Sequence, residues 1–148
     1  MKRLLIGPLD GHGRRSIYTE ITLMEPPRFL ALFNQPSPKY TTGRRDNTNV
    51  PDQALALLND PFVVAMAEHW STQLMTDGAV SATERAERMF VTAFARPPHP
   101  EETVRVVQLV ERSAEIRKAD SASLLECRSA WQDAAHAIFN LKEFIYVQ

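Results

Sequence analysis

The sequence predicts a mainly α-helical protein of about four to five antiparallel helices, with an irregular N-terminal segment containing at most one short strand pair. Three observations support this prediction. From residue 51 onward, apolar side chains recur every three or four positions, which is the helical period. A proline or a capping residue precedes most of these runs. Residues 1–50 show no such period and are rich in proline, glycine and basic side chains.

The N-terminal third is expected to be mostly loop. Residues 1–15 have no periodicity, whereas Ile17, Thr19, Ile21 and Leu23 alternate with other residues in the manner of a strand. A strand needs a partner, and the segment 39–42 is the candidate; otherwise residues 17–23 run extended over helices. Prolines at 26 and 27 can begin a short helix that ends near residue 34, before an extended proline-rich linker.

The next two helices begin at prolines. Pro51 starts a short helix, and its apolar side chains are expected to be buried: Ala54, Leu55, Leu57 and Leu58. Asp60 is placed to cap a second helix that begins at Pro61 and runs to about residue 75. Asp77 and Gly78 then end this helix.

Three more helices follow. Ser81 and Glu84 have the spacing of a capping box, ahead of a helix that continues to about residue 94. The segment starting at His99 and Pro100 places two acidic residues in the first turn of another helix, where the helix dipole favours them. The last helix is expected to bury a face that begins at residue 124 and includes Cys127 and Trp131.

Composition indicates an ordinary globular chain with one domain over residues 1–148, irregular over 1–50 and helical over 51–148. The net charge is −1, but residues 1–50 carry eight basic and four acidic side chains. The two regions can match each other's charge, or the first can form a local basic surface. Neither nucleic acid nor a membrane is an expected partner, and no apolar run resembles a signal peptide or a membrane span.

No cofactor, metal site or catalytic group is predicted. The four histidines have no histidine or cysteine three or four positions away, so surface or boundary positions are the better interpretation. Cys127 falls on the predicted buried face, which favours a core cysteine over a nucleophile. The segment 11–14 lacks the length and the lysine of a phosphate-binding loop.

One candidate site remains, and it is an anion site in the basic third. Guanidinium groups bind carboxylate, sulfate or phosphate through paired hydrogen bonds, and a helix start at Pro51 would add free N–H groups. The candidate residues are Arg14, Arg15, Arg44, Arg45, Thr48 and Gln53. The alternative is structural, because arginines in a loop-rich segment often bind backbone carbonyls and buried acids.

Four segments resemble one protein family. They are residues 13–18, the turn at Phe33-Asn34, the run from Gly43 to Phe62, and the Arg96-Pro97-Pro98 element together with residues 100–102 and 140–146. In this order they are similar to the domain known as PSD1, a domain of unknown function numbered 1553 that is abundant in planctomycetes. Four positions depart from the family pattern. Two arginines are replaced by Thr22-Leu23, an aspartate by Asn34 and a glycine by Ala95.

The resemblance implies a context rather than an activity. Such domains usually end long exported proteins that also carry a cytochrome-c-like domain and a second domain of unknown function. The resemblance therefore implies a non-catalytic C-terminal structural and interaction module, with the upstream domains of the parent protein as its partners. The alternative is a domain that binds an anion or a sulfated glycan through the arginine cluster, which has lost two charges in this chain.

Overall fold

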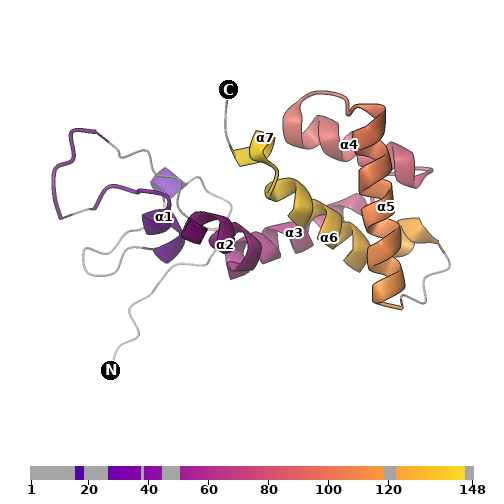
Figure 1. The fold of residues 1–148 in the computed structure, drawn as a ribbon, viewed down its shortest axis with the longest axis horizontal. Helices are drawn as coiled ribbons and strands as arrows, with labels where there is room; N and C mark the ends of the chain where they lie inside the picture. The colour runs from indigo at the N-terminus through magenta and orange to yellow at the C-terminus, as the bar shows by residue number, and fades with distance from the viewer. Residues whose placement is uncertain (1–15, 19–26, 38, 45–50, 119–122, 146–148) are drawn as a thin grey trace. The chain divides into compact units, whose positions relative to one another are not determined.

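The computed structural model describes residues 16–18, 27–37, 39–44, 51–118 and 123–145. The chain divides into two compact units, Met1–Phe62 (unit 1) and Val63–Gln148 (unit 2). Within the described ranges, all regular elements are helices and none is a strand (Figure 1). The prediction of a mainly α protein is confirmed, while the expectation of a single domain stays a prediction.

The described part of the chain holds seven α-helices, more than the four to five expected. The difference comes from short elements, since α1 (Arg28–Leu32) has five residues and α7 (Lys142–Ile145) has four. The expected last helix is also divided into a short 3-10 helix, η3 (Leu124–Glu126), then α6 (Arg128–Phe139), then α7. The indole Nε1 of Trp131 donates to the Leu124 carbonyl at 2.9 Å, which leaves that carbonyl outside a continuous helix.

The expected N-terminal strand pair is not found in the described residues. Ser16–Tyr18 form a single 3-10 turn, η2, and the rest of the expected strand lies outside the described ranges. The proposed partner segment is a turn, in which the Tyr40 N–H donates to the Ser37 carbonyl at 3.3 Å. Alternation of side chains alone does not make a strand, because each backbone N–H and C=O of a strand needs a partner.

Unit 1 is built on α1 and α2 (Pro51–Asn59). Phe29 contacts two rings, with its centroid 4.9 Å from that of Phe33 and 5.5 Å from that of Phe62. The side-chain amide of Gln53 donates to the Leu32 carbonyl at 3.0 Å, which joins the start of α2 to the end of α1. None of the described residues of unit 1 is buried.

The prediction that the apolar side chains of α2 are buried is wrong for most of them. Leu55 is 55% exposed and Leu58 is 51% exposed, and Ala54 is exposed as well, whereas Leu57 is half-buried. The helix therefore forms where its proline start predicts it, but most of its apolar side chains are exposed. Periodicity shows which residues share a helix face and does not show whether anything covers that face.

The next two helices, α3 and α4, begin at the predicted caps. In α3 (Pro61–Leu74) the Phe62 N–H donates to Asp60 at 2.9 Å, and in α4 (Ala82–Phe94) the Glu84 N–H donates to the Ser81 hydroxyl at 3.1 Å. The carboxylate of Glu84 accepts from the Val80 N–H rather than from that of Ser81, so the capping box is shifted by one residue.

The fifth helix and the turn before it complete this set. In α5 (Pro100–Ile116) the N–H of His99 donates to the Glu102 carboxylate at 2.7 Å. The preceding helix, α4, ends at Ala95, which adopts a left-handed conformation with φ of 54°. Glycine is the residue best suited to such a position, and this is where the family pattern has glycine.

The core of unit 2 lies where α5 packs against α4 and α6 (Figure 1). Trp131, Met89, Val110 and Ile138 are each at most 1% exposed. The buried face of α6 includes three small residues, Ala130, Ala134 and Ala135. Their small side chains allow the α6 backbone to lie close to the neighbouring helices. Cys127 is buried beside this cluster, as predicted.

Candidate functional site

The predicted anion site is only partly covered by the structure. Arg14, Arg15, Arg45 and Thr48 lie outside the described residues. Arg44 is exposed, and the amide nitrogen of Gln53 is bound to the Leu32 carbonyl. This bond gives Gln53 a structural role that the sequence did not reveal. The clustering of the six side chains stays a prediction.

The exposed apolar face of α2 is the clearest unsatisfied feature of unit 1. Leu55 and Leu58 stand three residues apart, so they lie on one side of the helix. In the same unit the side-chain oxygen of Gln35 is buried and has no hydrogen-bond partner. Buried polar atoms are normally paired, and apolar helix faces are normally covered. Within the described residues of unit 1, α2 therefore presents apolar side chains to water, and Gln35 keeps one buried oxygen without a hydrogen bond.

Arg85 is a buried arginine that sequence reasoning missed. It is 4% exposed, and its guanidinium donates to both carboxylate oxygens of Asp77, at 3.1 and 3.3 Å. A third bond goes to the Leu125 carbonyl at 2.6 Å, and the group lies 5.1 Å from the centroid of the Trp131 ring. Arg85 is paired with Asp77 and packs against Trp131, so it links α4 to the core and has a structural role.

Arg96 joins three segments through one guanidinium group. It donates to both oxygens of Glu102 at 2.9 Å, and to Glu143 on α7 at 2.6 and 2.7 Å. It also lies 5.6 Å from the Phe90 ring and 5.7 Å from the Phe94 ring. These bonds raise the pKa of Arg96, lower the pKa of Glu143 and lower the pKa of Glu102 to about 2. The Arg-Pro-Pro element is therefore an internal connector.

Asp133 anchors α6 to the end of α5. The guanidinium of Arg117 donates to it at 2.8 and 2.9 Å, and the hydroxyl of Ser113 donates to the same carboxylate. Burial alone would raise the pKa of Asp133, but the hydrogen bonds from Arg117 and Ser113 outweigh it, and the pKa is lowered. A carboxylate held ionised in this way is suited to structural pairing and not to accepting a proton.

No metal-binding grouping is found among the described residues. None of their histidine, cysteine, aspartate and glutamate side chains form a group of three or more that could hold a metal ion. His69 and His99 are exposed and His136 is half-buried, as expected of surface or boundary histidines, while His12 lies outside the described ranges. In the same ranges no helix is long and apolar enough to cross a membrane.

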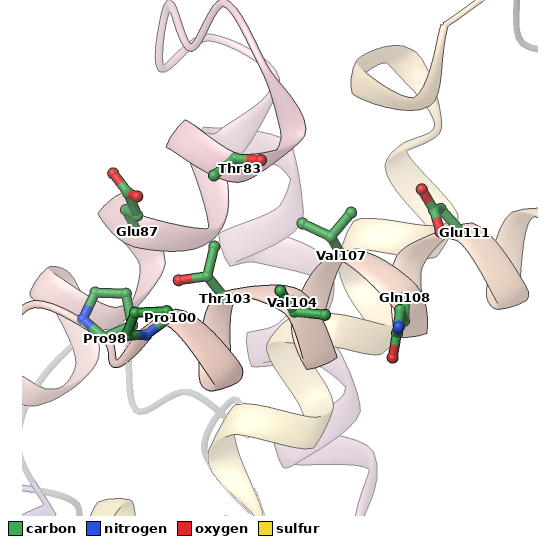
Figure 2. Close-up of a pocket in the computed structure, with 9 residues that line it drawn as sticks. All are labelled: Thr83, Glu87, Pro98, Pro100, Thr103, Val104, Val107, Gln108 and Glu111. Carbon is green, nitrogen blue, oxygen red and sulfur yellow. The ribbon is translucent and has the colours of Figure 1, made fainter.

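The described residues of unit 2 form hollows, two of which lie beside α4. The first is an open groove of about 550 Å³ between α4 and α5, lined by Val104, Val107 and two prolines, with Glu87 and Glu111 at its ends (Figure 2). The second, of about 630 Å³, lies between α3 and α4. Most charges of the second hollow are paired, since Asp77 binds Arg85 and Glu84 binds Arg88 at 2.5 Å, whereas Glu87, which borders both hollows, is in no ion pair among the described residues.

Together these features define a small helical protein in which most of the charged clusters of unit 2 hold the fold together. The chain belongs to the PSD1 family, described as protein of unknown function (DUF1553), whose model matches residues 8–110. No curated protein and no solved structure matches the chain. The match ends within α5, so α6 and α7, including residues 140–145, lie beyond it.

Proposed function

We propose that this chain is a non-catalytic structural and interaction module of a larger, exported protein, and that it docks on the preceding domains of that protein through α2. The exposed leucine pair on α2 carries the proposal. Leu55 and Leu58 present an apolar strip on a helix that has no buried residue. In most folded proteins such strips pack against other residues, and an adjoining domain of the same polypeptide is the simplest packing partner.

The contrast with the charged groups of unit 2 supports a non-catalytic role. The ionisable side chains with lowered pKa values are all bound by arginines of the same unit, through Arg88, Arg96 and Arg117. Catalytic acids and bases need a pKa near the working pH and access to a substrate. These carboxylates are held well below that range.

The test begins with the gene segment upstream of the chain. An in-frame continuation that encodes further domains, among them a CxxCH haem motif, is the expected result. The longer polypeptide and the 148-residue chain are then compared by hydrogen exchange. The α2 amides should exchange more slowly in the longer polypeptide, and Leu55→Glu should remove that protection. Val80→Glu, at a residue 85% exposed in unit 2, is the matched control.

Two results would contradict the proposal. One is the absence of any in-frame continuation. The other is equal exchange of the α2 amides in both polypeptides, with Leu55→Glu and Val80→Glu behaving alike. Either result would leave the exposed leucine pair without the partner assigned to it.

The alternative function is binding of an anionic ligand, such as a sulfated glycan, by the basic third of the chain. The exposure of Arg44 favours it, because its guanidinium is available to a ligand. Titration with a sulfated glycan should show binding that weakens with salt and is lost in the double variant Arg44→Ala/Arg45→Ala. The control is Arg105→Ala/Arg112→Ala, which removes the same charge from α5. Absence of binding at low salt would exclude this function.

A further inference from the structure

We propose that the groove between α4 and α5 binds an extended basic segment of a partner protein. This surface belongs to unit 2 and is independent of the α2 face. Its lining combines an apolar floor with two carboxylates, and no basic side chain lies among the described residues that line it. The expected occupant carries two cationic side chains separated by small apolar or proline residues.

The floor of the groove is apolar although it faces water. Val104 is 53% exposed and Val107 is half-buried, and Pro98 and Pro100 continue the same surface at the start of α5. Thr83 and Gln108 are exposed and add side chains that can hydrogen-bond to a peptide backbone. An open, elongated floor of this kind suits a peptide that lies along the surface better than a compact ligand.

The carboxylates stand at opposite ends of this floor. Figure 2 shows Glu87 at one end, Glu111 at the other, and Val104 and Val107 between them. Neither carboxylate takes part in an ion pair among the described residues, although seven ion pairs occur there. Both side chains are exposed, so each can accept a bond from an incoming lysine or arginine.

The spacing of the two charges defines the length of the peptide between them. Figure 2 shows Pro100 and Glu87 at the same end of the groove, and the helical rise along α5 from Pro100 to Glu111 is about 16 Å. An extended chain advances about 3.3 Å per residue, so two cations five positions apart would reach both carboxylates. Adjacent cations would reach only one of them. Charge spacing therefore distinguishes this groove from general attraction to an acidic surface.

The experiment compares two synthetic peptides of the same composition and charge. The first is Arg-Val-Pro-Val-Pro-Arg and the second is Arg-Arg-Val-Pro-Val-Pro, each capped at both ends and dye-labelled, and binding to the whole chain is measured by fluorescence anisotropy at low salt. The first should bind saturably and more tightly than the second. Glu87→Gln and Glu111→Gln should each weaken the first peptide by about two- to fivefold. Val104→Lys should abolish detectable binding.

Glu126→Gln is the matched control, because it removes one exposed carboxylate from η3, outside the groove. It should leave the affinity for the first peptide unchanged. Equal affinity for the two peptides, or equal weakening by Glu126→Gln and Glu111→Gln, would reduce the effect to general charge attraction and overturn the proposal. Absence of saturable binding at low salt would also overturn it, provided that the circular dichroism spectra show each variant to be folded.

Discussion

The two units of the chain differ in what their side chains contact. Unit 2 buries Trp131, Met89 and Ile138 and pairs its inner arginines with carboxylates, so its helices have both an apolar core and satisfied charges. The described part of unit 1 buries no residue, and the contacts seen there include those of three phenylalanine rings and one side-chain amide. Helix formation follows local signals in both units, but among the described residues a buried core is found in unit 2 alone.

The largest expected effect tests this difference in packing. Trp131→Ala removes a fully buried ring and should lower the free energy of unfolding by about 3–5 kcal/mol. The corresponding change in unit 1, Phe29→Ala, should cost about 1 kcal/mol, because that ring is half-buried and makes two ring contacts. Urea unfolding followed by circular dichroism measures both. Equal costs would show that the two units are packed alike.

Next in size is the buried ion pair of unit 2. Arg85→Ala leaves Asp77 without its partner at a site where the arginine is 4% exposed, and should lower the free energy of unfolding by about 3 kcal/mol. The exposed pair of Arg88 and Glu84 is the control, and Arg88→Ala should cost less than about 1 kcal/mol. A double-mutant cycle with Asp77→Ala isolates the pair itself. A small coupling energy would show that Arg85 acts through Trp131 instead.

Acid should weaken the contacts made by Arg96. The pKa of Glu102 is about 2 in the folded chain and about 4.3 when unfolded, so the folded form binds fewer protons between these values. Stability from this group is therefore present above about pH 4.3 and is lost as the pH falls toward 2. Urea midpoints measured from pH 6 to pH 2 should decline, and less steeply in Arg96→Gln. An unchanged slope in that variant would contradict the role assigned to Arg96.

The smallest effect concerns the left-handed residue that ends α4. Ala95→Gly should raise the free energy of unfolding by about 1 kcal/mol, because glycine adopts a positive φ without a steric cost. Ala65→Gly, at an exposed position inside α3, should lower it by about 1 kcal/mol. Thermal melts compare the two. A loss of stability in both variants would show that the αL conformation of Ala95 costs little.

Local signals in the sequence were sufficient for most helix starts. Asp60, Ser81 and the first turn at His99 were found because a cap is a short-range pattern of side chain and backbone. The division of the last helix was missed because it depends on a bond from the Trp131 indole to the Leu124 carbonyl, seven residues away. The strand prediction was wrong for Ile17 and Tyr18, because alternating side chains do not show whether a second strand is present to pair with them.

The site residues were harder to predict than the helices. Burial of Arg85 requires the Leu125 carbonyl, 40 residues further along, and no local pattern indicates it. A weak signal did exist, since Arg85 stands four residues before the buried Met89 on one helix face. The exposure of Leu55 was not predicted, because an apolar helix face was assumed to pack against other residues. The groove forms where α4 and α5 pack together. The spacing of residues along either helix does not specify that packing, so the groove could not be predicted.

Trp131 lies outside the part of the chain that the family model matches, and this affects where an expressed fragment should end. The family match covers residues 8–110, while the ring that fills the core and lies over Arg85 belongs to α6. A polypeptide cut at residue 110 would expose Met89 and Val110 to water and deprive Arg85 of its aromatic neighbour. The shortest stretch that can fold as unit 2 therefore extends past the shared sequence. Gene fragments chosen for expression should end after α7.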